Sequence, residues 1–281
     1  MRLDQLIVAR LTAEQKNISR AHIQRHIKAK GVLVNGKKHK KPHAPVNETD
    51  VIEYDQKAIL GDYIDYKKED VHELDKSWII HDEKDFFVIN KPPFITSEAC
   101  SGENFLVHRL DKGTSGVLVI ARSLQAQNEL QKQWKNRTVK KFYQAIVSGH
   151  LSPLKGAIEG ALYRSQTNRK KMAISKHPKA REARTEYEVI RYFMHNQMPV
   201  SHVLFMPLTG RTHQIRVHSA TLGFPIVGDP IYGHEDMNEK FGARHQILHS
   251  QKLVIAHPQT KKELSFEAPL PDDFVRLLEA E

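Results

Sequence analysis

The apolar residues of this chain occur in short runs, and this spacing limits the folds that the chain can adopt. The longest runs, such as Val117 to Ala121, are about five residues long. A helix that spans a membrane needs about 20 mostly apolar residues in a row, so we expect no helix that crosses a membrane. Short apolar runs next to turn residues are typical of buried strands, which favours a globular protein built around a β-sheet.

The distribution of charge along the 281 residues predicts two domains. Residues 1–54 hold 11 Lys and Arg against 5 Asp and Glu, whereas residues 55–76 hold 4 against 7. An acidic, weakly patterned segment between two basic ones is typical of a linker. We therefore predict a first domain over residues 1–54, a linker over 55–76 and a second domain over 77–281.

The formal net charge of +10 indicates a polyanionic partner. Nucleic acid and an acidic membrane surface are the two classes of partner that such a charge favours, and solubility alone is the simpler explanation. The chain has one cysteine, which excludes an internal disulfide and a zinc site built from several cysteines. A single cysteine fits a reducing, cytoplasmic setting.

The first domain has the pattern of two helices and a hairpin. Leu3, Leu6, Ile7 and Leu11 are spaced as on one face of a helix. Ser19 can cap a second helix that ends at Gly31, and Asn35-Gly36 between short apolar runs predicts a tight hairpin. Basic residues crowd these elements, among them Arg20, Lys37 and Lys38. They can bind phosphates, although a solvated lysine face gives the same pattern.

The second domain is expected to be rich in strands. The segments "SWII", "FFVIN", "GVLVIA", "KFYQAIVSG", "EARTEYEVIRY" and "VSHVLFMPL" are enriched in branched and aromatic residues. Ser123 can cap a helix that carries Ala126, Leu130 and Trp134 at four-residue intervals. The predicted fold class is α+β, with a small α/β domain followed by a mixed, largely antiparallel β-sheet and flanking helices.

The segment "HRLDKGTSG" places a carboxylate before the buried strand at Val117. Gly113 and Gly116 allow backbone conformations that other residues resist, and Thr114 and Ser115 can bind nearby backbone groups. Asp111 is therefore expected on a rigid loop at the edge of the sheet. Its side chain either performs chemistry or only caps the turn, and these residues alone leave both possibilities open.

In the segment "LTGRTHQIRVHSA", Thr209-Gly210 predicts a turn, and "RTHQIRVH" then alternates, which predicts a strand. Arg216 then lies on the open face, where it can pair with a carboxylate and keep it ionised. An ordinary exposed strand Arg is the alternative.

The sequence predicts no metal site and no other pattern of catalytic residues. His213 and His218 would point to opposite faces of that strand, and His245 and His249 would share a helix face without a further ligand. The sequence contains no Gly-rich phosphate loop, and Cys100 lacks the surroundings of a reactive thiol.

The motifs "VINKPP", "HRLDKGTSG" and "GRTHQIRVH", in this order, resemble those of the RluA-type family of pseudouridine synthases. The segments "RKKMAISKHPKAREARTEYEV" and "PIVGDPIYG" also resemble the family, so the resemblance covers nearly the whole chain. Residues 1–54 resemble the ribosomal S-four-type RNA-binding domain that often precedes this catalytic domain.

The resemblance implies an enzyme that detaches a uracil from its ribose within RNA, turns it and rejoins it through carbon 5, without cofactor or metal. It implies that Asp111 is the catalytic carboxylate, that Arg216 pairs with it and that Tyr143 stacks on the base. Arg109 is expected to fill the gap that the extruded base leaves, and Leu248 to line the base pocket. The mechanism, by a covalent adduct or by elimination, stays open.

The expected partner is RNA and not a membrane, with large-subunit ribosomal RNA favoured over transfer RNA, and the protein is expected to be a monomer. A transfer RNA pseudouridine synthase and a non-enzymatic RNA-binding or ribosome-assembly factor are the alternatives. An RNA glycosylase or nuclease is a further one, which would release the base or break the strand.

Overall fold

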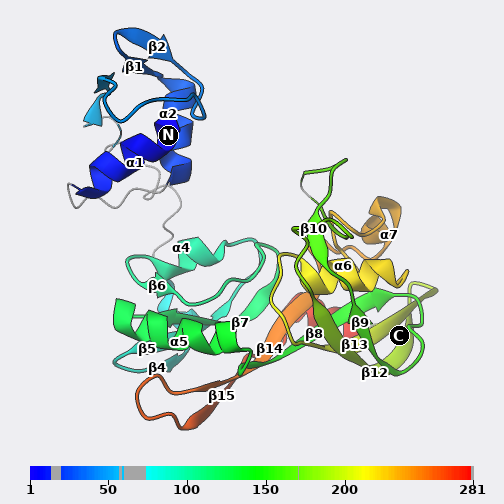
Figure 1. Ribbon diagram of the computed structural model, residues 1–281. Coiled ribbons are helices and arrows are strands. Elements are labelled where there is room, and N and C mark those ends of the chain that lie inside the picture. Colours follow the sequence, from blue (N-terminus) through cyan, green and yellow to red (C-terminus); the bar gives the residue numbers. More distant parts are fainter. Residues whose placement is uncertain (14–19, 57–58, 60–73, 170, 280–281) are drawn as a thin grey trace. The chain divides into compact units, whose positions relative to one another are not determined.

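The computed structural model describes residues 1–13, 20–56, 59, 74–169 and 171–279. The chain divides into two compact units, Met1–His72 and Glu73–Glu281 (Figure 1). Most of the predicted linker, residues 55–76, lies outside the described residues, as does Ser19. Among the described helices, none combines the length and the apolar composition that crossing a membrane would need.

The first unit packs two helices against a small sheet. The helices are α1 (Leu3–Ala13) and α2 (Arg20–Ala29), and the sheet has the strand order β2-β1-β3. Its strands are β1 (Val32–Val34), β2 (Lys37–His39) and β3 (Ile52–Glu53). The predicted apolar face of the first helix is confirmed, because Leu3, Ile7 and Leu11 are fully buried together with Ile23 and Ile27 of α2.

The predicted hairpin of the first unit is confirmed. Asn35 and Gly36 have φ angles of 48° and 76°, the left-handed conformation that a tight hairpin turn requires at both central residues. The turn joins β1 to β2, which pair in antiparallel register from Val34 with Lys37 to Val32 with His39. Lys37 and Lys38 are therefore presented on an exposed strand directly after the turn.

The second unit is built on a ten-stranded sheet, which confirms the predicted α+β class. The strand order is β4-β5-β7-β14-β8-β13-β12-β9, with β15 beside β14 and β6 beside β7. The described pairs of this sheet are antiparallel except for β7 with β14. The strands are β4 (Ile79–Asp82), β5 (Phe86–Lys91), β6 (Phe105–Leu106), β7 (Ser115–Ala121), β8 (Lys140–Ser148), β9 (Lys155–Glu159), β12 (Arg184–His195), β13 (Met198–Pro207), β14 (Leu248–Ala256) and β15 (Glu263–Glu267).

A separate two-stranded hairpin, β10 (Leu162–Arg164) with β11 (Met172–Ile174), projects from the sheet (Figure 1). The helical elements of the second unit are short apart from one of 13 residues. They are η1 (Lys76–Trp78), α4 (Ser97–Ser101), α5 (Leu124–Asn136), α6 (Gln214–Thr221), α7 (Glu235–Lys240) and α8 (Asp272–Glu279).

Helix α5 forms as its sequence predicts. Ser123 is its N-cap, and the Ser123 hydroxyl accepts a hydrogen bond of 3.2 Å from the backbone N–H of Ala126. Ala126 and Leu130 are buried against apolar residues of β5, β7 and β14, including Val88, Val119 and Leu253, and Trp134 is partly buried beside them. The helix thus covers one side of the central strands.

The parallel seam between β7 and β14 depends on a glycine and a buried histidine. Gly116 has φ of +110°, and a Cβ on it would lie 2.7 Å from the backbone nitrogen and carbonyl carbon of Ser250. His249 lies between the hydroxyl of Ser115 (2.8 Å) and the carbonyl of Ala268 (3.2 Å). Because a carbonyl can only accept, Nε2 of His249 donates to it and Nδ1 accepts from Ser115.

Two predictions of secondary structure are wrong. The segment that contains Arg216 is helix α6 rather than a strand, and His249 lies in β14 rather than on a helix with His245. In α6 both the apolar Ile215 and Val217 and the polar Arg216 are buried. Alternation indicates a strand only where one face is exposed, so it carries no information for a segment that is buried on all sides.

We expect Gly116→Ala to lower the free energy of unfolding by about 2–4 kcal/mol, since the change adds backbone strain and a clash with the backbone of Ser250. Gly210→Ala is the matched control, because a Cβ there meets nothing within 4 Å. Urea denaturation of both variants measures the difference. Equal stability of the two would contradict the close approach of β7 to β14.

Candidate active site

Five of the residues predicted for the site lie around one pocket of about 280 Å³ in the second unit. They are Asp111, Tyr143, Arg216, Arg109 and Leu248. The loop before β7, strand β8, helix α6 and the start of β14 supply them. Residues that are far apart in the sequence thus meet at one place.

The other three predicted residues belong to the first unit and are not part of this pocket. Lys37 and Lys38 lie in β2 with exposed side chains. Arg20 begins helix α2, and its side chain lies outside what the structure describes.

The loop that carries Asp111 is held by buried side chains on either side of it. The hydroxyl of Ser97 accepts from the N–H of Leu110 (2.9 Å) and donates to the carbonyl of the same residue (3.1 Å). Within the loop, the N–H of Thr114 donates to the carbonyl of Asp111 at 2.9 Å. The backbone next to the carboxylate therefore has its hydrogen bonds satisfied and a fixed conformation.

Lys91 fixes the same loop from the end of β5. Its side chain is fully buried, and Nζ donates to the carbonyls of Pro92 (2.7 Å), Ile95 (2.8 Å) and Lys112 (3.3 Å). Burial lowers the pKa of Lys91 to about 8, although the charge of Asp111 opposes this. This lysine is part of the motif "VINKPP", but it was not predicted as a site residue. Its place at the end of an apolar strand is the feature of the sequence that could have indicated a buried role.

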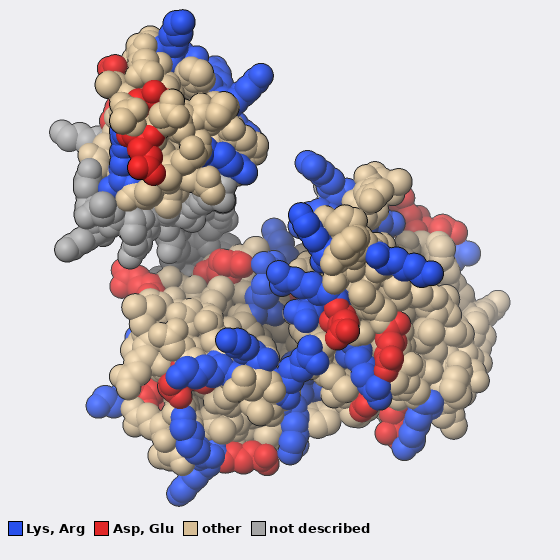
Figure 2. Space-filling view, in the orientation of Figure 1, with Lys and Arg blue, Asp and Glu red and all other residues tan. Residues whose placement is uncertain are grey.

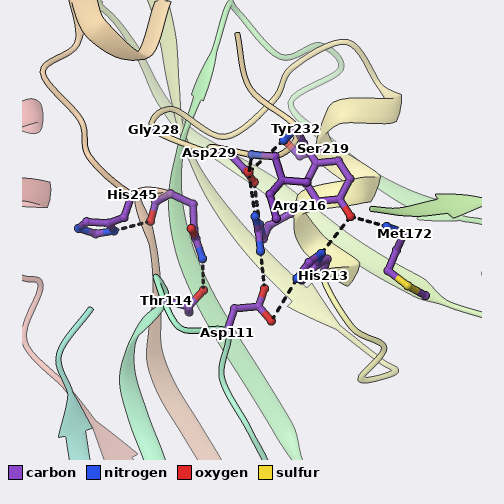
Figure 3. A network of polar contacts seen from close by, with 12 residues as sticks. Asp111, Thr114, Met172, His213, Arg216, Ser219, Gly228, Asp229, Tyr232 and His245 are labelled. Carbon is purple, nitrogen blue, oxygen red and sulfur yellow. Dashed lines mark hydrogen bonds and ion pairs between the residues drawn. The ribbon is translucent and has the colours of Figure 1, made fainter. Parts of the chain in front are cut away.

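Arg216 is the centre of the site's electrostatics. It is 3% exposed, and it donates from Nε and Nη2 to the two carboxylate oxygens of Asp229 at 2.7 and 2.8 Å. From Nη1 it donates to Oδ2 of Asp111 at 2.9 Å. Figure 3 shows the guanidinium between the two carboxylates. The predicted pairing with Asp111 is therefore present, made from a helix rather than from a strand.

Arg216 keeps its positive charge despite its burial. Burial on its own lowers the pKa of Arg216, but hydrogen bonds and attraction from Asp229 and Asp111 outweigh it and raise the pKa above its ordinary value. Asp229 is fully buried and also accepts from the N–H groups of Ile231 (2.8 Å) and Tyr232 (3.0 Å). Asp229 thus compensates the buried cation, while Asp111 remains at the edge of the pocket with 19% of its side chain exposed.

Sequence analysis missed Asp229 as a site residue. It quoted "PIVGDPIYG" only for its resemblance to a family segment. An acidic residue between Gly228 and Pro230 is typical of a turn, and nothing in that pattern indicates a buried partner for a distant arginine.

Tyr143 and Leu248 form an apolar wall of the pocket. They lie on the neighbouring strands β8 and β14, in the cluster that also contains Ala145 and Ile215. Burial raises the pKa of Tyr143 to about 12, so its phenol keeps its proton at neutral pH. The wall can therefore accept a flat, uncharged ring.

His108 stays neutral beside the pocket and shapes it through packing. Its ring stacks on Trp134 with centroids 4.6 Å apart, and Nε2 accepts from the N–H of Val119 at 3.0 Å. Burial lowers the pKa of His108 to about 3. Arg109, next in the chain, extends outward, with 68% of its side chain exposed and Nη1 3.9 Å from Glu98.

Basic side chains surround the pocket. Lys141 donates to the carbonyl of Thr209 at 2.9 Å, and burial, with Arg211 and Arg137 nearby, lowers its pKa to about 8. Figure 2 shows Lys and Arg gathered on this face of the second unit. A phosphate placed here would relieve the repulsion between these cations.

His213 and Tyr232 complete the polar network. His213 Nδ1 lies 3.0 Å from the Tyr232 hydroxyl, which accepts from the N–H of Met172 at 2.7 Å (Figure 3). His213 Nε2 lies 4.0 Å from Oδ1 of Asp111. Within the described part of the chain, no three His, Cys, Asp or Glu side chains gather as the ligands of a metal would.

The arrangement supplies one carboxylate, held by a buried arginine, at the edge of a pocket that suits a neutral flat ring. Such a carboxylate can act as a nucleophile or as a base toward an atom in the pocket.

Comparisons with known proteins point to one family. A model of the family described as RNA pseudouridylate synthase matches residues 85–221, and a model of the S4 domain matches residues 1–52. The ribosomal large subunit pseudouridine synthase D of Escherichia coli O6:H1 is 31% identical over 293 residues, which cover 93% of this chain and 86% of that protein.

Further similarities come from a second relative and from a solved structure. The ribosomal large subunit pseudouridine synthase D of Neisseria meningitidis serogroup A is 42% identical over 183 residues, 62% of this chain. The chain spans about half the length of that relative, with 47% covered. The structure of human RNA Pseudouridylate Synthase Domain Containing 1 matches 68% of this chain and 82% of its own, with a TM-score of 0.61 and 29% identity.

We expect Asp229→Asn to lower the free energy of unfolding by about 3–5 kcal/mol, because it leaves the buried Arg216 without its main counter-charge. Asp236→Asn, at an exposed position of α7, is the matched control and should change stability by less than about 0.5 kcal/mol. Chemical denaturation measures both. A loss below about 1 kcal/mol for Asp229→Asn would show that Asp111 alone can compensate Arg216.

Proposed function

Because the chain belongs to the RNA pseudouridylate synthase family, we propose that it isomerises a uridine within RNA to pseudouridine, with Asp111 as the catalytic carboxylate. The observation that supports this most directly is the Asp229–Arg216–Asp111 chain of ion pairs. It presents one oriented carboxylate to a pocket lined by Tyr143 and Leu248.

The proposed reaction needs no external reagent, since it rearranges bonds within one nucleotide. The bond from N1 of uracil to C1′ of the ribose breaks, and a bond from C5 to C1′ forms. C5 loses a proton and N1 gains one, so atoms and charge balance. Asp111 serves either as the nucleophile that adds to C1′ or as the base that removes the proton of C2′, and both routes require it ionised and close to the sugar.

The neighbours of Asp111 have distinct roles in this proposal. Arg216 orients Asp111, because the Nη1–Oδ2 hydrogen bond holds one of its two oxygens and leaves Oδ1 for the substrate. Tyr143 offers the face of its ring to the detached base, and Leu248 restricts the space in which that base turns. Holding the reactants in this geometry is the main source of rate that the site can supply.

The target uridine must leave its stack before it can reach Asp111. Extrusion of a base costs a few kcal/mol, and least for a base in an unpaired loop. Arg109 lies one residue before Leu110 at the pocket mouth, and its exposed guanidinium can occupy the space that the base vacates. Lys141 and Arg211 at the rim can bind the adjoining phosphates.

Large-subunit ribosomal RNA is the proposed substrate, and a monomer acting in the cytoplasm is part of the same proposal. The names of the relatives from Escherichia coli and Neisseria meningitidis support this choice of RNA over transfer RNA. A non-enzymatic RNA-binding factor would not need the paired Asp111 and Arg216 or a pocket beside them. The S4 match and the basic β2 strand support RNA binding by the first unit.

The direct test is to incubate the purified chain with ribosomal and transfer RNA transcripts at the same ionic strength and to map pseudouridine in each. Site-specific conversion in the ribosomal transcript is expected. Conversion of transfer RNA alone would overturn the substrate. Release of free uracil, or a broken strand, would indicate a glycosylase or a nuclease instead.

We expect Asp111→Asn to reduce the rate of pseudouridine formation by about 1,000-fold or more, because the amide cannot act as nucleophile or base. Its affinity for RNA should change little, since the exposed basic residues proposed to bind RNA, such as Arg109, Lys37 and Lys38, keep their charges. Release of tritium from uridine labelled at C5 measures the rate, and filter binding measures the affinity. Activity of Asp111→Asn close to that of Asp236→Asn would exclude Asp111 as the catalytic group.

The first unit should contribute phosphate contacts but no chemistry. We expect the double variant Lys37→Ser, Lys38→Ser to weaken RNA binding and to reduce the slope of log Kd against log salt by about 1–2. The control is Lys155→Ser with Lys252→Ser, because Glu188 and Glu267 already pair with these lysines. An unchanged salt slope in the first double variant would show that this hairpin does not touch RNA.

A further inference from the structure

His213 lies in the pocket beside Asp111 and has no role in the function proposed above. It is the residue before helix α6, and its φ of 56° places it in the left-handed region, which is uncommon for a residue with a side chain. Its side chain is 16% exposed and makes no capping hydrogen bond to the helix. Its ring is directed instead toward Tyr232 and Asp111 (Figure 3).

The hydrogen bonds of Tyr232 determine which nitrogen of His213 carries the proton. The N–H of Met172 donates to the Tyr232 oxygen at 2.7 Å. The proton of that hydroxyl therefore needs another acceptor, and among the described residues the hydrogen-bonding partner in reach is His213 Nδ1, at 3.0 Å. If Nδ1 accepts, the proton of a neutral imidazole is on Nε2.

The protonated nitrogen is the one that faces Asp111. Nε2 lies 4.0 Å from Oδ1, the carboxylate oxygen that Arg216 leaves free, since Arg216 binds Oδ2. A distance of 4.0 Å is too long for a hydrogen bond, but catalytic contacts often tighten only when the substrate is bound. Closing about 1 Å would convert this approach into a hydrogen bond from Nε2–H to Oδ1.

We propose that His213 is a positioning residue: in the tautomer that Tyr232 imposes, its Nε2–H holds the free oxygen of Asp111 in place toward the ribose of the bound uridine. This inference rests on the proposed function. It adds a second point of attachment to a carboxylate that would otherwise turn about its single hydrogen bond to Arg216. It also gives the Tyr232 hydroxyl a role, which is to determine the tautomer of His213.

The surroundings of His213 favour a neutral donor over a cation. The charged and titratable groups that face it are Asp111, Arg216, Asp229, Arg109 and Tyr232. Burial is the largest influence and lowers the pKa of His213, and Arg216 and Arg109 act in the same direction against Asp111 and Asp229. A neutral Nε2–H can therefore orient Oδ1 without a second full charge that would weaken the carboxylate as a nucleophile or base.

The same contacts link the carboxylate to the projecting hairpin. Met172 is the first residue of β11, and Lys171 beside it places Nζ 5.9 Å from the centre of the Tyr232 ring. Arg216 lies over that ring at 5.3 Å. A movement of the β10–β11 hairpin would alter the donor to Tyr232 and, through it, the orientation of His213 (Figure 3).

Three substitutions of His213 separate the proposed role from a structural one. The amide nitrogen of Gln can take the place of Nε2, that of Asn takes the place of Nδ1, and Ala offers no donor. We expect kcat to fall by about 100-fold in His213→Asn and His213→Ala, and to stay within about tenfold of wild type in His213→Gln. The Kd for RNA should be unchanged in all three, and His150→Gln, at an exposed loop position, is the control.

Asn tolerates the left-handed backbone well, so His213→Asn also separates loss of the donor from backbone strain. Equal kcat in the Gln, Asn and Ala variants would overturn the proposal. So would a loss that appears in Kd rather than in kcat.

Nitrogen-15 NMR of histidine-labelled protein tests the tautomer without any RNA, so it keeps its meaning even if the wild-type protein forms no pseudouridine. We expect His213 to show the Nε2–H form in the wild type and a mixture of both neutral forms in Tyr232→Phe. An Nδ1–H form in the wild type, or no change in Tyr232→Phe, would overturn the proposal. Absence of pseudouridine from wild-type reactions together with the expected spectra would refute the proposed function but not this geometry.

Discussion

The second unit depends on the buried guanidinium of Arg216 and on the two carboxylates that share it. A charge that is 3% exposed costs several kcal/mol in lost solvation unless its partners are well placed. Asp229 offsets this loss, because it accepts two hydrogen bonds from Arg216. It also accepts two hydrogen bonds from backbone N–H groups. Asp111 is thus the second carboxylate on one cation, so the cluster carries a net negative charge located at the pocket. The two acids differ in burial, since Asp229 is fully enclosed and Asp111 lies at the edge of the pocket.

The position of Asp111 at the edge of the pocket requires that its loop does not move. Residues at the ends of the strands hold this loop in place. Lys91 at the end of β5 binds three carbonyls, and Ser97 binds both backbone groups of Leu110. Two residues before β14, the side chain of Gln246 donates to the hydroxyl of Thr114 at 3.1 Å and fills the space where a Cβ on Gly113 would lie. The strands that end at this edge therefore determine the position of the carboxylate, and a reaction that depends on position needs such a rigid support.

The sequence predicted the strands, the capped helix α5 and the Asn35-Gly36 hairpin, because each depends on local pattern: burial of one face, a hydroxyl at a helix start, or a backbone that tolerates positive φ. The motifs also identified the family, which the comparisons confirm. The prediction from the sequence pattern was wrong at α6. Arg216 and Ile215 are both buried there, so the alternation of polar and apolar residues does not mark an exposed face. The sequence pattern also failed to find Lys91, Asp229 and His213 as members of the site. Charged and polar residues of these types usually lie on the surface. Each of the three also has a partner 13 or more positions away in the chain, namely Lys112, Arg216 and Tyr232, and only the fold brings these partners close.

The remaining titratable groups of the pocket are kept uncharged, which leaves its electrostatics to Asp111 and the surrounding cations. Burial holds the pKa of His108 at about 3 and that of Tyr143 at about 12, and it lowers the pKa of His213, so these side chains offer neutral surfaces near pH 7. Lys141 behaves differently, since burial and neighbouring arginines bring its pKa to about 8. An RNA phosphate at the rim would favour its charged form and raise that pKa again. Binding of a polyanion would thus strengthen the positive rim at the same time as it covers the pocket. The charges inside the pocket would remain those of Asp111, Arg216 and Asp229.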